Sequence, residues 1–208
     1  MFNRKSFIEE SLNESADVKK LILEKCSDDL NKAADELINV VRNGKKIMFI
    51  GNGGSAADSQ HLATEFMIRL AHDLNRPAIA AIALTTDTSN LTAGGNDIGF
   101  ENVFARNVEG LGNEGDALIC FSTSGNSPNI IKAVLKAKEK NILSIGFLGK
   151  NNGGKLKSVC DYSITIPSEN TQRIQEGHIT VGHILCEIVE REVYQNYKES
   201  NGQKFSKE

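Results

Sequence analysis

The sequence has no excess of basic charge, no long apolar run and no leader-like N-terminus. Its 24 Lys and Arg residues are outnumbered by 27 Asp and Glu residues, a formal net charge of -3, whereas general nucleic-acid binders carry a basic face. No segment approaches the roughly 18 consecutive apolar residues of a membrane-spanning helix. Residues 1–15 lack the apolar core of a signal peptide. We therefore expect a cytoplasmic protein that binds neither nucleic acid nor membrane.

Cysteine is sparse, and its positions argue against a disulfide framework. The four cysteines are Cys26, Cys120, Cys160 and Cys186, without a C-x-x-C pair. Three of them lie in apolar runs, which indicates buried, reduced thiols. Hydrophobic residues make up 39% of the 208 residues and charged residues 25%, as in an ordinary globular protein. Because no repeat or linker divides the chain, we expect a single domain over residues 1–208.

Residues 46–65 are the most informative stretch. A short apolar run is followed by Gly51-Asn52-Gly53-Gly54 and an alanine-rich segment, which predicts a buried strand, a glycine turn and the start of a helix. Ser55 and Asp58 have the spacing of a helix-capping box. The backbone N–H groups of such a turn, and the positive end of the helix dipole, can hold an anion or a sugar. The turn does not match the G-x-G-x-x-G pattern of dinucleotide sites.

His61 and Glu65 follow one turn into the same predicted helix. They are four residues apart and therefore project from one face. A histidine and a carboxylate at this spacing can bind one metal ion or share proton transfer. Spacing alone leaves a surface ion pair as an equal alternative.

Apolar runs and polar breaks predict strands alternating with helices. The expected strands cover residues 46–50, 78–84, 117–121, 142–148 and 162–166. The expected helices are two amphipathic helices within residues 6–41 and single helices at 100–111, 128–140 and 171–197, with a loop or broken helix at 85–95. This alternation implies an α/β fold with a doubly wound, five-stranded parallel sheet. We divide the domain into N-terminal helices (1–44), an α/β core (45–168), a C-terminal helix (169–198) and a frayed tail (199–208).

A second polar turn, Ser122 to Ser127, follows the third predicted strand. Its four hydroxyl side chains and backbone N–H groups lie at a helix start, an arrangement that favours a phosphate dianion. Ser127 suits the cap of that helix, and Pro128 suits its first position. The alternative is a Ser/Thr-rich cap without a ligand. The turn is not a Walker A loop, but like the glycine turn it lies at the carboxyl end of a strand, where ligands of such sheets bind.

The final predicted helix carries three further candidates. Gln175 and His183 differ by roughly 80° around the helix axis and can share a broad face, whereas His178 is roughly 140° from His183. The two histidines should not serve one site, and geometry alone does not choose between them. Gly177 and Gly182 each cost about 1 kcal/mol relative to alanine inside a helix, which suggests close packing against another backbone.

Five motifs, in order, resemble those of a known family. They are G-N-G-G-S with downstream Q-H-x-A-x-E, then G-N-D, S-T-S-G-N-S and R-I-Q-E-x-H-I-x-x-x-H. This set resembles the phosphoheptose isomerases (sedoheptulose-7-phosphate isomerases) of the sugar isomerase (SIS) domain superfamily, from about residue 6 to residue 194. The resemblance implies an SIS fold and a homotetramer in which the terminal helices help build the interface and the sites lie between subunits.

The resemblance also assigns roles to residues. Sugar contacts are implied for Asn52, Gly53, Gly54, Asn96 and Asp97, with Glu65 and Gln175 also at the substrate. Phosphate contacts are implied for Ser122, Thr123, Ser124 and Ser127. One Zn²⁺ per subunit is implied, with His61, Glu65, Gln175 and His183 as ligands, an N/O set that suits this ion. The resemblance thus selects His183 over His178, which we expect to be a packed helix histidine.

The implied reaction is aldose–ketose isomerisation of sedoheptulose 7-phosphate to D-glycero-D-manno-heptose 7-phosphate, the first step of nucleotide-activated heptose biosynthesis. It passes through an enediol(ate), with Glu65 and His183 as the acid–base pair and either of them as the base. Three places depart from the family pattern: Ile68-Arg69-Leu70, Gly177 and Gly94-Gly95.

Two alternatives stay open. One is a non-catalytic SIS scaffold that binds a bacterial replication initiator; the relative of that kind lacks the acid at the position of Glu65 and the histidine at the position of His183, and this chain has both. The other is a sensor or an isomerase for another sugar phosphate, since phosphate loops are shared across the superfamily.

Overall fold

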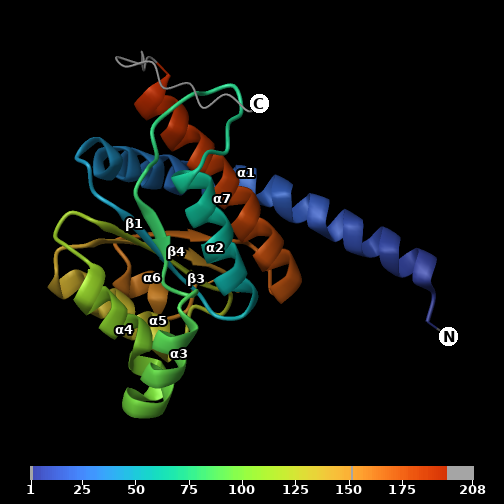
Figure 1. The fold of residues 1–208 in the computed structure, drawn as a ribbon. Coiled ribbons are helices and arrows are strands. Elements are labelled where there is room, and N and C mark those ends of the chain that lie inside the picture. The colour runs from blue at the N-terminus through green and yellow to red at the C-terminus, as the bar shows by residue number, and fades with distance from the viewer. Residues whose placement is uncertain (1, 151, 196–208) are drawn as a thin grey trace, which may run out of the picture.

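The computed structural model describes residues 2–150 and 152–195, so the predictions for residues 196–208 and for Asn151 lie outside it. Five strands form one parallel sheet in the order β2-β1-β3-β4-β5 (Figure 1). The strands are β1 (Ile47–Ile50), β2 (Ala81–Ala83), β3 (Ala117–Ser122), β4 (Leu143–Leu148) and β5 (Tyr162–Thr165). The predicted doubly wound α/β sheet is confirmed.

The strand order reverses next to β1, and this places the two predicted ligand turns side by side. From β1 the chain moves outward to β2, and it then returns to the other side of β1 with β3. Ile50, at the end of β1, pairs in register with Cys120 of β3. Crevices at such a reversal, beyond the carboxyl ends of the strands, are where ligands bind in this class of sheet. The glycine turn, residues 51–54, follows β1. The second polar turn, residues 122–127 and called the hydroxyl loop from here on, begins at the last residue of β3.

Helices cover both faces of the sheet (Figure 1). On one face α1 (Arg4–Arg42), α2 (Gly54–Met67) and α7 (Thr171–Tyr194) pack over a core that includes Phe49 and Phe121. On the other face α4 (Phe100–Leu111) and α5 (Pro128–Glu139) pack over a core that includes Met48 and Leu118. Neighbouring strand residues thus alternate between the two cores, and the inner strands read as continuous apolar runs because both faces are buried.

The prediction of two N-terminal helices is wrong, because α1 is one continuous helix of 39 residues. Neither Gly nor Pro occurs within it, and residues such as Asp28 and Asp29 cost a helix only about 0.7 kcal/mol or less each relative to alanine. The Asn3 side chain caps its start by accepting from the N–H groups of Lys5 and Ser6. The N-terminal part of α1 extends beyond the body of the fold (Figure 1). We define it as the arm, residues 4–17; its inner part is still tied to α7 by the hydrogen bonds of Ser11 with Arg173 and of Ser15 with Glu176.

The segment 85–95 forms the broken helix that was one of its two predicted forms, and one further short helix was not predicted. The segment 85–95, predicted as a loop or broken helix, holds α3 (Thr88–Gly94), which continues into a π-helical turn, η1 (Gly95–Gly99), before α4. The short helix α6 (Leu156–Val159) follows the loop expected from residue 151. Among the described residues, no helix combines the length and apolar character needed to cross a membrane.

Gly177 and Gly182 do mark close packing, but the groups against them are side chains rather than backbone. A methyl group on Gly177 would lie 2.8 Å from Ile166, and one on Gly182 would lie 2.4 Å from Leu62 of α2. These glycines therefore let α7 lie close to Ile166, which follows β5, and to α2.

All four cysteines are free thiols, as predicted, and three are buried. Although Cys120 and Cys160 are 40 positions apart, their Sγ atoms lie 3.8 Å from each other.

Candidate active site

The turn after β1 starts α2 earlier than the capping-box prediction placed it. Gly53 is the N-cap, and α2 begins at Gly54, so Ser55 and Asp58 both lie inside the helix. Gly53 adopts φ +57°, in the left-handed region that glycine enters without steric cost. This sharp turn brings the helix start directly after Asn52. The predicted capping box is therefore wrong, although the predicted strand–turn–helix unit is present.

His61, Glu65 and His183 come together in space, although 122 positions separate the two histidines. The Nε2 atoms of His61 and His183 are 2.7 Å apart, and the His61 Nε2 atom is 3.3 Å from Glu65 Oε1. One ligand atom from each of the three side chains lies within 4.8 Å of the others. In a tetrahedral zinc site, ligand atoms about 2.1 Å from the ion are roughly 3.4 Å apart. The cluster therefore has the donor types for such an ion and gathers them within 4.8 Å, with the two Nε2 atoms closer together than they would be around zinc.

Burial shifts the pKa of one histidine of this cluster and of a carboxyl group next to it. Burial and the adjacent His61 lower the pKa of His183, and Glu65 only partly opposes them. His183 is consequently a neutral imidazole at neutral pH, free to bind a metal ion or accept a proton. One turn earlier on α2, burial raises the pKa of Asp58 to about 6 despite the opposing effect of His61, and its Oδ2 atom is buried without a hydrogen-bond partner.

Gln175 lies against the start of α2. A methyl group on Gly54 would lie 2.5 Å from Gln175 Nε2, so glycine at this position leaves room for the amide where it now lies. His178 points elsewhere: it is fully buried, its Nε2 atom is 2.9 Å from the Leu148 carbonyl oxygen, and burial lowers its pKa to about 4. The expectation that His178 is a packed helix histidine is confirmed.

The hydroxyl loop runs from the end of β3 to Ser127, the N-cap of α5. Ser127 makes no side-chain cap hydrogen bond; its Oγ atom instead lies 3.4 Å from Ser122 Oγ. The Gly125 N–H donates to Ser122 Oγ at 3.1 Å, which closes the loop. Thr123 and Ser124 are partly exposed between them. Hydroxyl groups gathered before a helix N-terminus suit a phosphate.

The structure does not bring Asn96 and Asp97 to these groups within one chain. Both lie exposed on η1, where Asn96 Nδ2 donates to Asp97 Oδ1 at 2.7 Å. Figure 1 shows α3 and its continuation as a projection on the side of the sheet away from α7.

Sequence reasoning missed two polar pairs beside the site. Asn52 and Asn129, the second residue of α5, exchange side-chain hydrogen bonds of 3.0 Å and 2.8 Å. Arg76 forms a fully buried ion pair with Glu190 and donates to the Glu65 carbonyl oxygen at 2.9 Å. Each pair joins residues far apart in the chain, so periodicity and motif spacing carried no signal for either.

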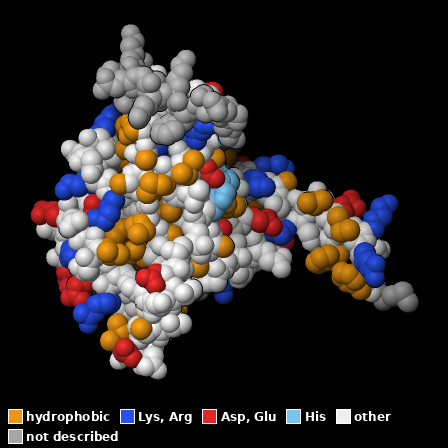
Figure 2. Space-filling view, viewed as in Figure 1, with side chains coloured by type: hydrophobic (Ala, Val, Ile, Leu, Met, Phe, Trp, Pro, Cys, Tyr) orange, Lys and Arg blue, Asp and Glu red, His pale blue; other side chains and the backbone are white. Residues whose placement is uncertain are grey.

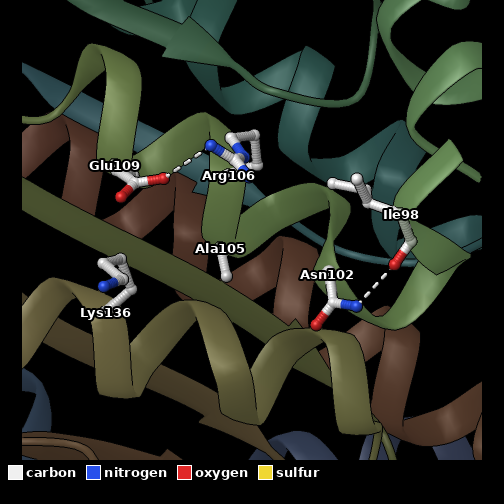
Figure 3. Close-up of a pocket in the computed structure, with 6 residues that line it drawn as sticks. All are labelled: Ile98, Asn102, Ala105, Arg106, Glu109 and Lys136. Atoms are coloured by element: carbon white, nitrogen blue, oxygen red, sulfur yellow. Dashed lines mark hydrogen bonds and ion pairs between the residues drawn. The ribbon is translucent and has the colours of Figure 1, made fainter.

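A separate hollow of about 250 Å³ lies between α4 and α5 (Figure 3). Its lining includes Arg106, Glu109 and Lys136 but none of the predicted site residues. Its cations are already paired, Arg106 with Glu109 at 3.2 Å and Lys136 with Glu139. We therefore place the site at the glycine turn and the hydroxyl loop.

A parallel sheet carrying these two turns at its strand reversal, with a His/Glu/His cluster beside them, defines a sugar-phosphate isomerase of the SIS type. The SIS domain family matches residues 11–149 of the chain.

Individual relatives narrow this class. The chain is 49% identical to the phosphoheptose isomerase of Clostridium acetobutylicum over 91% of its length and 96% of the relative. It is 51% identical to phosphoheptose isomerase 2 of Campylobacter jejuni over 93% and 96% of the two chains. The solved phosphoheptose isomerase of Neisseria gonorrhoeae superposes with a TM-score of 0.84 at 38% identity, covering 90% of this chain and 98% of that one. The chain belongs to the phosphoheptose isomerase family of SIS domain proteins.

Proposed function

We propose that the protein converts sedoheptulose 7-phosphate to D-glycero-D-manno-heptose 7-phosphate in the cytoplasm, as the first step of nucleotide-activated heptose synthesis. The observation that carries this proposal is the convergence of His61, Glu65 and His183, all within 4.8 Å, from two helices of an isomerase fold. The relatives named for this activity supply the substrate. A scaffold without chemistry would not need this cluster.

Glu65 and His183 form the acid–base pair of the proposed reaction. One group removes a proton from carbon 1 of the ketose, next to the carbonyl, while the carbonyl oxygen gains a proton to give the enediol. The proton then returns to carbon 2, and the hydroxyl on carbon 1 loses its proton to become the aldehyde oxygen. The neutral imidazole of His183 and the carboxylate of Glu65 can each accept or return a proton, so either can start the cycle.

Zinc would be held, one ion per subunit, by His61, Glu65, Gln175 and His183. The two imidazole nitrogens and the carboxylate oxygen supply three donors of the kind zinc prefers, gathered within 4.8 Å, and Gln175, on α7, lies against Gly54 at the start of α2. When bound, the ion would supply positive charge beside the substrate carbonyl. The zinc content of the purified protein, measured by native mass spectrometry, should fall in His61→Ala without loss of fold.

The two turns would hold the rest of the substrate. Ser122, Thr123, Ser124 and Ser127 would bind the phosphate through hydroxyl and backbone N–H groups. Asn52, Gly53 and Gly54 would contact the sugar, with Glu65 and Gln175 at its reacting end. Asn96 and Asp97, exposed on η1, would complete a site that lies between subunits.

The proposal includes a homotetramer, supported by two separate apolar surfaces. The arm exposes Phe7 (53%), Ile8 (58%) and Leu12 (67%), and Figure 2 shows apolar side chains gathered along it. Apart from the arm, Ile68 of the segment after α2 and Ile82 of edge strand β2 are also exposed. Two distinct self-contacts per chain are what a tetramer with dihedral symmetry needs. Sedimentation equilibrium should give four chains, and Leu12→Glu should give a smaller species.

Turnover of sedoheptulose 7-phosphate by purified protein tests the proposal directly. Glu65→Gln and His183→Ala should each abolish it while circular dichroism stays unchanged; His178→Gln, on the same helix but buried elsewhere, should keep it. Full activity in the first two variants would refute the acid–base assignment. A panel of ketose phosphates, with and without a chelator, separates this substrate from other sugar phosphates.

A further inference from the structure

Asn52 lies at the junction of the two turns, and its side chain is held by one other residue. Asn52 Nδ2 donates to Asn129 Oδ1 at 3.0 Å, and Asn129 Nδ2 donates back to Asn52 Oδ1 at 2.8 Å. Asn52 follows β1, and Asn129 follows the hydroxyl loop, 77 positions later. This cyclic amide pair is therefore a direct polar link between the glycine turn and the start of α5.

The orientation of the Asn129 amide is fixed by its own helix. The backbone N–H of Ile130 donates to Asn129 Oδ1 at 3.0 Å. A backbone N–H can only donate, so the oxygen of the Asn129 amide must face it and the Nδ2 group must face Asn52. Asn52 then has to present its Oδ1 atom to Asn129 Nδ2 and its own Nδ2 group to Asn129 Oδ1. Asn129 thereby decides which end of the Asn52 amide is the acceptor.

We infer that Asn129 is a positioning residue for the sugar end of the substrate, acting only through Asn52; this inference rests on the proposed function. Asn129 is 4% exposed and offers a ligand almost no accessible surface, whereas Asn52 is partly exposed. After the pair has formed, Asn52 retains one N–H and one oxygen lone pair. These remaining groups, held in a single orientation, can bind a sugar hydroxyl as donor and acceptor.

The test is a double-variant cycle read by ligand binding. Calorimetry compares inorganic phosphate with heptitol 7-phosphate, a sugar alcohol phosphate that cannot be isomerised, on wild type, Asn52→Ala, Asn129→Ala and the combined variant. Losing the orientation of two hydrogen bonds should weaken heptitol phosphate binding roughly tenfold in Asn129→Ala. Phosphate affinity should stay within about twofold, and Asn129→Ala should have no further effect once Asn52 is alanine.

Matched variants separate positioning from stability. Asn129→Ser keeps a small hydroxyl near the Ile130 N–H but is too short to hold Asn52, so it should reproduce the alanine result if Asn129→Ala folds poorly. Asn107, on α4 and 7% exposed, is a buried asparagine that belongs to neither turn nor to the His/Glu/His cluster, and Asn107→Ala should leave both affinities unchanged.

Two results would overturn the inference. Equal weakening of phosphate and heptitol phosphate would show that Asn129 acts on the hydroxyl loop instead. If adding Asn129→Ala to Asn52→Ala weakened heptitol phosphate binding as much as Asn129→Ala does alone, Asn129 would have a role independent of Asn52. A wild type that binds heptitol phosphate yet isomerises no sugar phosphate would refute the proposed function and leave the binding cycle interpretable.

Discussion

Adding one methyl group at Gly54 tests whether Gln175 is a metal ligand. The new Cβ atom would lie 2.5 Å from Gln175 Nε2 and 3.1 Å from Gln175 Cδ, whereas ordinary contacts begin near 3.4 Å. The amide must therefore move by about 0.9 Å. Metal–ligand distances hold within about 0.2 Å, so a shifted Gln175 can no longer bind the ion in its place. Because the end of a glutamine side chain moves easily, the fold should survive.

The expected result for Gly54→Ala is a large loss of zinc affinity. Removing a hydrogen-bond partner of a metal ligand typically lowers the metal affinity 10–100-fold, so displacement of a ligand itself should lower it at least this much. Competition with a chromogenic chelator measures the zinc Kd, and circular dichroism checks the fold.

Gly110 supplies the control for this experiment. It lies in α4 with nothing within 4 Å of an added Cβ atom. Gly110→Ala should therefore keep the wild-type zinc Kd and raise stability by about 0.5–1 kcal/mol. If Gly54→Ala bound zinc as tightly as Gly110→Ala, Gln175 would not be a ligand.

Three further predictions concern stability, each measured by urea unfolding with a chelator present. Burial lowers the pKa of His178 to about 4 from 6.5, so on acidification the unfolded chain takes up the proton before the folded chain does. The free energy of unfolding should therefore fall by about 2.5 kcal/mol between about pH 7.5 and pH 4.5, and it should fall correspondingly less in His178→Gln. The same pH dependence of the unfolding free energy in wild type and His178→Gln would contradict this prediction. Burial raises the pKa of Asp58 to about 6, so stability falls as pH rises from about 4 to 6; Asp58→Asn should gain on the order of 1 kcal/mol at neutral pH after discounting for partial exposure, and no gain would refute it. Arg76→Ala leaves the Glu190 carboxylate buried without its cation and should cost about 3–5 kcal/mol. Arg76→Met/Glu190→Leu should recover only part of this loss, because Glu190 also accepts from the backbone N–H groups of Leu70 and Ala71; equal stability of the single and double variants would count against this account.

Sequence reasoning found the strands because the inner ones are buried on both faces, which leaves a continuous apolar run for each. It found the hydroxyl loop because Ser127-Pro128 marks a helix start. It misplaced the start of α2, since a left-handed Gly53 can turn the chain before the Ser55 capping signal. It divided α1 because charged residues between apolar positions were taken for a break, although no Gly or Pro occurs there.

The pairing of distant side chains had no local signature. Helical spacing separated His178 from His183 but could not say which of them faced α2. The 2.7 Å approach of His61 to His183 depends on how α2 packs on α7, which Gly182 allows by accepting Leu62. Asn129 pairs with Asn52 because the strand reversal makes β1 and β3 neighbours. Such contacts depend on tertiary packing. The resemblance to a family predicted contacts only between residues that belong to one of its motifs.

The continuity of α1 has a consequence for how the protein withstands dilution. At 1.5 Å per residue its 39 residues are about 58 Å long, which is too long for the rest of a single chain to cover. In a single chain, the apolar side chains of the arm, Phe7, Ile8 and Leu12, are therefore exposed to water. In the proposed tetramer that surface is buried only by other chains, which couples unfolding to dissociation. The melting temperature should then rise with protein concentration by mass action, and a sample stored at nanomolar concentration should lose its structure at temperatures a concentrated sample tolerates.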